Sequence, residues 1–128
     1  MTAAIVDTSV LIARETGRPI RIPLLPDRLA VSIITIGELR AGVLAAADVA
    51  TRDRRLATLL DTLELHAIPV DGIVAEAWAR LRQDLREHSL RMPVNDSWIA
   101  ATAIAHGVPL VTQDDDYIDA PGLTVIHV

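Results

Sequence analysis

The stretch VNDSWIAATAIAHGVPLVTQDDDY, residues 94–117, decides the fold because its pattern changes half-way along. Up to Gly107 the apolar residues recur at helical spacing, and glycine is favoured just after a helix ends. The apolar run from Val108 to Thr112 then predicts a buried strand, which three adjacent aspartates follow. A helix that leads directly into a buried strand is typical of parallel α/β sheets.

The same alternation runs through the rest of the chain. The apolar run Ala3–Val6 predicts a first strand, and the cap-type residues 7–9 open a helix that runs to about Glu15. Three prolines within 16–28 predict a loop. We therefore expect an α/β fold, a parallel sheet of about five strands with helices on both faces, in a single domain of residues 1–128. The remaining strands are predicted at Leu29–Ile34, Glu64–Val70 and 123–128, and the remaining helices at 35–47, 51–63 and 73–88.

Composition excludes several classes of function. The 128 residues contain no Cys, so a thiolate nucleophile and a disulfide framework are unavailable. All twelve basic residues are Arg, which excludes chemistry through a Lys Schiff base or a Walker-type lysine. No apolar run approaches the roughly 18 residues of a membrane span, and no signal peptide is evident, so we expect a cytoplasmic protein. The net charge of −5 disfavours nucleic-acid binding by charge alone, unless cations bridge the acids to phosphate.

Acidic residues follow or flank several of the predicted strands. Asp7 follows the first strand, Glu38 lies four residues past the second, Asp96 opens the helix before the fourth, and 114–116 follow the fourth. Ligands of parallel sheets bind beyond the carboxyl ends of the strands, so these side chains are expected to converge there. Clustered carboxylates need a counter-charge, and oxygen ligands suit Mg²⁺ or Mn²⁺.

Each acid also has a purely structural interpretation. Asp7 suits a helix N-cap, and Asp96 suits the positive end of a helix dipole. Glu38 points away from the bulky residues Ile36, Leu39 and Val43, which is typical of a solvated helix face. The four histidines lie in strands or near helix ends, and we assign none of them to catalysis.

The three adjacent aspartates can be divided by the pleat of a strand. Side chains of an extended chain alternate between two sides, so Asp114 and Asp116 are expected to share a side. Asp115 is expected to point away into solvent and to be replaceable.

Taken together, these motifs resemble a PIN domain, and more closely a VapC-type toxin ribonuclease of a type II (VapBC) toxin–antitoxin system. The likeness covers nearly the whole chain: IVDTSVLI places an acid at Asp7, TIGELRAG places one at Glu38, and residues 94–117 place the others. The acids after Thr112 fall two and four residues on, as in the family. Tyr117 stands where the family often has Phe.

The resemblance implies a PIN-like (Rossmann-like) fold and a Mg²⁺- or Mn²⁺-dependent endoribonuclease that uses metal-activated water. It implies that Asp7, Asp96 and Asp114 are metal ligands, with Asp116 secondary or acting through water. Glu38 would bind a second metal or act as a base. It also implies a VapB-type antitoxin, whose C-terminal segment covers the site, and a homodimer of the toxin. Candidates for hydrogen bonds to the ligands or to substrate phosphate are Thr8, Ser9, Asn95 and Thr112.

Other interpretations stay open at this point. Arg14 and Arg40 are candidate phosphate contacts or ordinary solvated arginines. The Trp78 stripe belongs to the core or to a dimer interface. A catalytically inactive PIN-like binding module is an alternative function. A phosphatase with Asp7 as nucleophile wants a second Asp two residues on, where this chain has Ser9.

Overall fold

Five short strands form one parallel sheet in the order β3-β2-β1-β4-β5 in the computed structural model, which describes residues 3–117 and 120–128. All four pairings between neighbouring strands are parallel. The α/β fold and the five-stranded sheet are therefore confirmed. The strands are β1 (Ala3–Val6), β2 (Arg28–Ser32), β3 (His66–Ile68), β4 (Leu110–Thr112) and β5 (Val125–His127).

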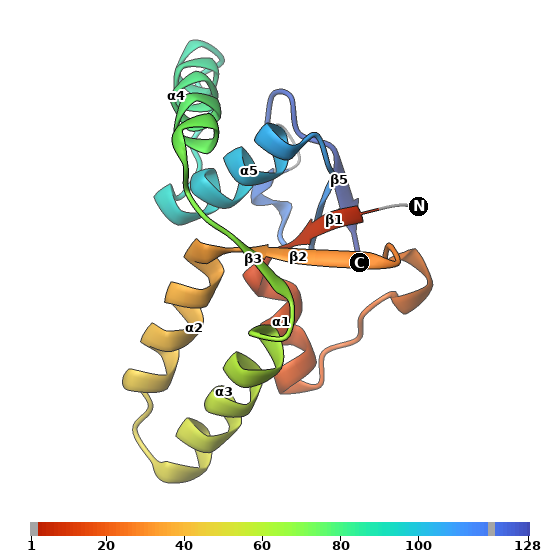
Figure 1. The fold of residues 1–128 in the computed structure, drawn as a ribbon, viewed down its shortest axis with the longest axis vertical. Helices are drawn as coiled ribbons and strands as arrows, with labels where there is room; N and C mark the ends of the chain where they lie inside the picture. Colours follow the sequence, from red (N-terminus) through yellow and green to blue (C-terminus); the bar gives the residue numbers. More distant parts are fainter. Residues whose placement is uncertain (1–2, 118–119) are drawn as a thin grey trace.

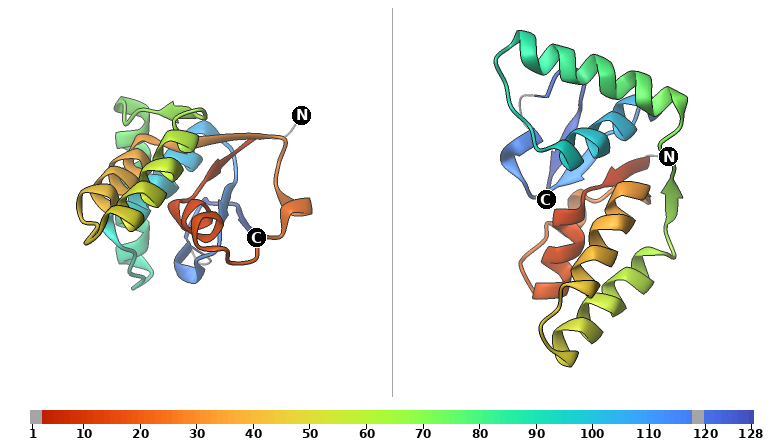
Figure 2. Two further views of the ribbon diagram at one scale, coloured as in Figure 1. Left: turned by 90° about the horizontal axis from the view of Figure 1, so that it is seen from below. Right: turned by 90° about the vertical axis from the view of Figure 1, so that its left-hand side faces the viewer.

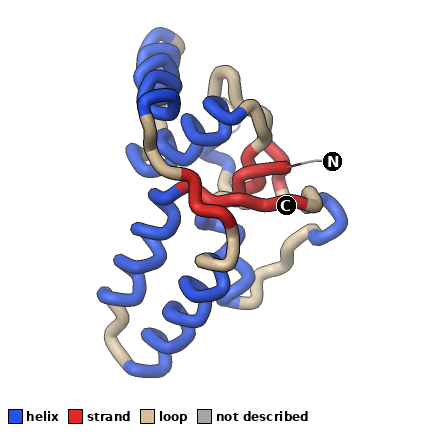
Figure 3. The backbone as a smooth tube through the Cα atoms, viewed as in Figure 1, coloured by secondary structure: helices blue, strands red, loops and turns tan. Residues whose placement is uncertain are grey.

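Helices cover both faces of this sheet, as the sequence predicts (Figure 1). The helices α4 and α5 lie on one face, and α1, α2 and α3 lie on the other, which Figure 2 shows from two further directions. The tube in Figure 3 shows the strands as a thin layer between the two sets of helices. The helices are α1 (Thr8–Thr16), α2 (Ile33–Leu44), α3 (Val49–Thr62), α4 (Gly72–Glu87) and α5 (Val94–His106), with short 3₁₀ turns η1 (Ile22–Leu24) and η2 (Asp115–Tyr117).

Two apolar clusters form the core, one on each face of the sheet. Alternation along the strands divides them: Ile5 and Leu110 pack under α4 and α5, whereas Val6 and Val111 pack over α1, α2 and α3. This is the period of two expected for pleated strands. The central strands are buried on both sides, which explains why they read as continuous apolar runs.

Local capping shifts several of the predicted boundaries. The second strand was expected to reach Ile34, but it ends at Ser32, whose side chain accepts a hydrogen bond of 3.1 Å from the Ile34 N–H and opens α2. Asp48 likewise caps α3 by accepting from Thr51 N–H at 2.7 Å, so this helix begins at Val49. The third strand is shorter than predicted, and the proline-rich segment contains η1 within its loop.

The Trp78 stripe packs inside the chain. Val74, Leu81 and Leu85 are buried, and the half-buried Trp78 ring stacks on Trp98 of α5 with centroids 4.3 Å apart. Its indole N–H donates to Ser97 Oγ at 3.0 Å. These contacts support the core interpretation, while homodimerisation stays a prediction. Among the described residues, no helix is long and apolar enough to cross a membrane.

A glycine between α5 and β4 allows the chain to turn directly from helix to strand. Gly107 has a φ of 64°, and the N–H groups of Gly107 and Val108 donate to Ile104 and Ala103 carbonyls, both at 3.1 Å. This left-handed cap ends the helix, and only residues 107–109 separate it from β4. The acids on α5 and after β4 are consequently held at a defined separation.

We expect Gly107→Ala to lower the free energy of unfolding by about 1 kcal/mol, because alanine resists a positive φ. The matched control is Gly37→Ala in the middle of α2, where nothing lies within 4 Å of an added Cβ. That change is expected to raise the free energy by up to about 1 kcal/mol, because alanine favours the helix. Urea unfolding measures both. Equal effects at the two positions would contradict the role assigned to Gly107.

Candidate active site

The site begins where β1 and β4 end side by side. Val6 pairs with Val111 in the parallel ladder, and the Asp7 N–H donates to the Val111 carbonyl at 2.8 Å. Asp7 and Thr112 therefore leave the sheet next to each other. In the strand order, the chain runs outward from β1 to β3 in one direction and continues through β4 and β5 in the other. Such a switch point is where parallel sheets form their ligand crevice.

Asp7 is a buried carboxylate surrounded by hydrogen-bond donors. Its side chain is 2 % exposed. Oδ2 accepts from the Thr112 hydroxyl at 2.9 Å and, more weakly, from the Ser9 N–H at 3.4 Å, while Oδ1 accepts from the Tyr117 hydroxyl at 2.9 Å. Asp7 is thus the N-cap of α1 and also part of the acidic site. The capping interpretation is confirmed for this residue, and its role as a metal ligand stays a prediction.

The hydroxyls beside Asp7 form an ordered chain of donors. The single proton of Thr112 is donated to Asp7, so the Ser9 hydroxyl must be the donor in its 3.2 Å contact with Thr112. Ser9 Oγ in turn accepts from the Gln113 N–H at 3.0 Å, and Thr112 Oγ1 accepts from the Asp114 N–H at 3.0 Å. This chain ties the start of α1 to the segment after β4.

Glu38 is held in the same way by Thr8. The Thr8 hydroxyl donates to Glu38 Oε1 at 2.8 Å, and its oxygen therefore accepts from Thr35 Oγ1, 2.9 Å away. The Asn95 amide contacts Glu38 Oε2 at a long 3.5 Å. Glu38 is half-buried, so the interpretation as a freely solvated helix face is wrong. The residues Thr8, Ser9, Asn95 and Thr112 all contact acids or hydroxyls of the site.

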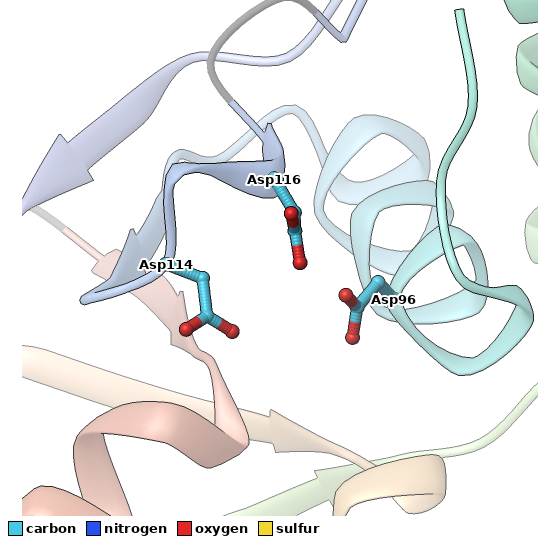
Figure 4. Close-up of side chains that lie close together, drawn as sticks. All are labelled: Asp96, Asp114 and Asp116. Atoms are coloured by element: carbon cyan, nitrogen blue, oxygen red, sulfur yellow. The ribbon is translucent and has the colours of Figure 1, made fainter.

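Three carboxylates face one another across the opening of the site. Asp96, Asp114 and Asp116 each offer an oxygen, and these atoms all lie within 4.8 Å of one another. Figure 4 shows Asp96 approaching from α5 and the other two from the segment after β4. The sequence places Asp96 at the opening of this helix, and in the structure Pro93 is the N-cap. Asn95 and Asp96 both lie inside the first turn of α5, which aims Asp96 at the other two acids.

Asp114 and Asp116 lie together and Asp115 points away, as predicted, but the extended backbone from which this was predicted is wrong. Asp114 and Asp116 share the cluster, and Asp115 instead lies 3.5 Å from His127 with its side chain 85 % exposed. The backbone there is not extended, since residues 115–117 form the 3₁₀ turn η2. The turn both excludes Asp115 and carries Tyr117 back under the site.

Burial and neighbouring negative charges both raise the pKa values of two of these acids. Burial, together with the charge of Asp7, raises the pKa of Asp96 to about 6, and the charges of Asp114 and Glu38 add to this rise. Burial, Asp7 and Asp116 likewise raise the pKa of Asp114, although Arg18 opposes the change. Five carboxylates thus act on one region from β1, α2, α5 and the segment after β4. An all-oxygen set of this kind fits a hard divalent cation.

The sequence and the fold of this chain both match those of known proteins. The PIN domain family model matches residues 4–123. The ribonucleases VapC5 and VapC4 of Mycobacterium tuberculosis are each 45% identical to this chain, covering 98% of it and 93% and 96% of their own lengths. The chain is a PIN domain of the VapC family. The crystal structure of VapBC-5, a toxin–antitoxin system of Mycobacterium tuberculosis, superimposes with a TM-score of 0.91 at 43% identity and full coverage of both chains. FitAcB of Neisseria gonorrhoeae superimposes with a TM-score of 0.77 at 27% identity.

In this VapC-family chain, the two candidate arginines lie on exposed helix surfaces and are not part of the acidic cluster. Arg14 lies two turns along α1 from Asp7, at 3.9 Å from Asp61, on an exposed surface. Arg40 is exposed on α2, two residues after Glu38. Arg18 is the arginine that lowers the pKa of Asp114, and sequence reasoning did not single it out.

Two further residues of the site were missed by sequence reasoning. Thr35 is fully buried and supports Thr8, and nothing in its local pattern distinguishes it from an ordinary helical threonine. Tyr117 was noted only as a departure from the family. A buried tyrosine needs a hydrogen-bond partner for its hydroxyl. A tyrosine directly after the three aspartates could therefore have been expected to donate to one of the acids.

The raised pKa of Asp96 predicts a pH dependence of stability in the metal-free protein. The ordinary value of 3.8 applies to the unfolded chain and about 6 to the folded one. The unfolded chain therefore loses its proton first, and the free energy of unfolding falls as pH rises from about 4 to about 6. We expect Asp96→Asn to flatten this fall and to be more stable than the native protein above pH 6.

Urea unfolding at pH 4, 5, 6 and 7 with a chelator present measures this effect. The control is Asp115→Asn, which removes an exposed acid outside the cluster and is expected to leave the slope unchanged. A native-like slope in Asp96→Asn would show that Asp96 is not the group responsible.

Proposed function

We propose that this chain is a divalent-metal-dependent endoribonuclease and the toxin of a VapBC-type toxin–antitoxin pair. The observation that carries the proposal is the convergence of Asp96, Asp114 and Asp116 beside Asp7 and Glu38, in a chain 45% identical to ribonuclease VapC5. The Asp114 and Asp116 carboxylates and that of Asp96 would hold Mg²⁺ or Mn²⁺ directly. Asp7, which is more deeply buried, would be a further ligand of the cation. It would use the lone pairs of its carboxylate that do not already accept hydrogen bonds.

The chemistry proposed is hydrolysis of a phosphodiester bond. The oxygen of a water molecule forms a bond to phosphorus while the bond from phosphorus to the leaving sugar oxygen breaks. A bound divalent cation supplies a lowered water pKa and neutralises negative charge on the phosphate. Glu38 is the residue proposed to take the proton of the water. Thr8 holds one of its carboxylate oxygens, and the other oxygen, Oε2, makes only a long contact with Asn95.

Polar side chains around the acids would orient the ligands and the substrate. Ser9 and Thr112 hold Asp7 and the main chain of Asp114 in one hydrogen-bonded unit. Asn95 is exposed at the start of α5, where its amide can also donate to a substrate phosphate. Arg18 and Arg40 are exposed near this edge and are candidates for phosphate contacts away from the reacting bond.

The alternative of a catalytically inactive module receives no support from the site. All the acids expected from the family are present, and four of them affect the pKa of a fifth or share its cluster. A phosphatase with a nucleophilic Asp7 is also disfavoured, because Asp7 is buried and both of its carboxylate oxygens accept hydrogen bonds. Ser9, where that class wants a second acid, is bonded to Thr112.

A VapB-type antitoxin is proposed as the protein partner. The likeness of this chain to the VapBC-5 toxin–antitoxin structure supports this proposal. An apolar groove of about 590 Å³ between α1, α3 and the segment that carries η1 also supports it. Leu11 and Leu25 line the groove, and Arg14 and Asp61 lie on its rim. Ile22, which is 62 % exposed, adds apolar surface to the lining of this groove. A segment of the antitoxin would cover this surface, and we propose a second copy of the chain as a further partner.

Cleavage should depend on Asp114 but not on Asp115. We expect Asp114→Asn to reduce Mn²⁺-dependent cleavage of RNA about 100-fold or more, since even residues that only support a ligand are worth 10–100-fold. Asp115→Asn carries the same change of charge and is expected to cleave within a factor of about 3 of the native rate. Initial rates on a panel of transfer, ribosomal and messenger RNA measure both. A severe loss in Asp115→Asn alone would reverse the assignment.

The toxin role is tested by expression in a bacterial host. Expression of the native chain is expected to stop growth, and co-expression of the small protein encoded by the neighbouring reading frame is expected to restore it. Asp7→Asn should grow normally without the neighbour. Growth arrest that persists in Asp7→Asn would separate toxicity from the acidic site.

A further inference from the structure

A buried tyrosine, Tyr117, lies beneath the acids of the site. Tyr117 lies in η2 with its side chain fully buried, packed in the core cluster that includes Ile99 and Leu110. The apolar ring suits this cluster, but the hydroxyl does not. A phenol that is withdrawn from water costs free energy unless its hydroxyl finds a partner.

That partner is the buried carboxylate of Asp7. The Tyr117 hydroxyl donates to Asp7 Oδ1 at 2.9 Å, whereas Thr112 and Ser9 donate to the other oxygen. Tyr117 is thus the donor that the structure shows on Oδ1. A carboxylate oxygen accepts two hydrogen bonds, so one acceptor position on Oδ1 stays available. The carboxylate is held at both oxygens without being fully occupied.

Replacing the tyrosine by phenylalanine would separate the two roles of this side chain. The single proton of the Tyr117 hydroxyl is the one donated to Asp7. Phenylalanine would fill the same space in the core and would supply no donor to Asp7.

We propose that Tyr117 is a positioning residue that arranges Asp7 for binding of the divalent cation. The inference rests on the proposed metal-dependent function and deepens it, because it assigns part of the metal affinity to a residue that never touches the metal. A donor fixed behind a ligand sets the orientation of that ligand, and losing such a donor typically weakens metal binding by 10–100-fold. Because the hydroxyl is neutral, it holds the Asp7 carboxylate without cancelling the negative charge that attracts the cation.

The test is Mn²⁺ binding to Tyr117→Phe, measured by calorimetry and by the electron paramagnetic resonance of free Mn²⁺. We expect at least about a 10-fold weaker affinity than in the native protein. Circular dichroism at low temperature confirms that the variant is folded before titration, and the ring that fills the core is retained.

The control is Thr102→Val, which removes another fully buried hydroxyl. Thr102 lies in α5, and its hydroxyl donates to the Trp98 carbonyl at 2.8 Å, outside the acidic site. This change is expected to cost stability while leaving Mn²⁺ affinity unchanged. A merely structural role for Tyr117 would make the two variants alike.

The activity of Tyr117→Phe gives a second measurement. Because Tyr117 acts on the cation's ligands rather than on the substrate, excess Mn²⁺ is expected to restore RNA cleavage to within about 3-fold of the native rate. Native protein that binds no Mn²⁺ would overturn the proposed function itself. Native binding together with equal or tighter Mn²⁺ binding by Tyr117→Phe, or a loss matched by Thr102→Val, would overturn only the role of Tyr117.

Discussion

Parallel pairing of β1 with β4 is the constraint on which the site depends. Because Val6 lies opposite Val111, the next residues in each strand, Asp7 and Thr112, leave the sheet as neighbours and bond to each other. α1 starts at one of these ends and the 3₁₀ turn η2 follows the other, so each carries its side chains into the same opening. A change of register by one residue would turn Asp7 away from Thr112 and would also exchange the apolar residues between the two faces of the sheet.

Gathering carboxylates in this way costs stability, and the surrounding donors show how the cost is limited. The groups that the structure shows on Asp7 and Glu38 are mostly hydroxyls, from Thr8, Thr112 and Tyr117. An arginine in direct contact would neutralise a carboxylate and compete with a cation for it. Neutral hydroxyls instead hold the oxygens in place and leave the negative charge. Burial, together with that uncompensated charge, raises the pKa values of Asp96 and Asp114.

Much of the fold was predictable because its determinants are local. Apolar runs, cap residues and the glycine at 107 mark the strands and helices with errors of only a few residues. Those errors arise where one side chain decides the boundary, as Ser32 does by capping α2 two residues before the expected end of β2. The acids expected at the carboxyl edge do converge there. The neighbours that hold them, Thr35 and Tyr117, come from apolar surroundings in which polar side chains are not conspicuous.

The sequence by itself determined the alternation of strands and helices, the parallel sheet and the identity of the acids, since periodicity and motif spacing are properties of the chain. Only the tertiary structure decided which oxygens meet. The 3₁₀ turn places Asp116 beside Asp114, removes Asp115 and brings Tyr117 under Asp7, a residue 110 positions away in the chain. Contacts of that separation depend on how the two halves of the sheet pack together, and no local pattern encodes the result.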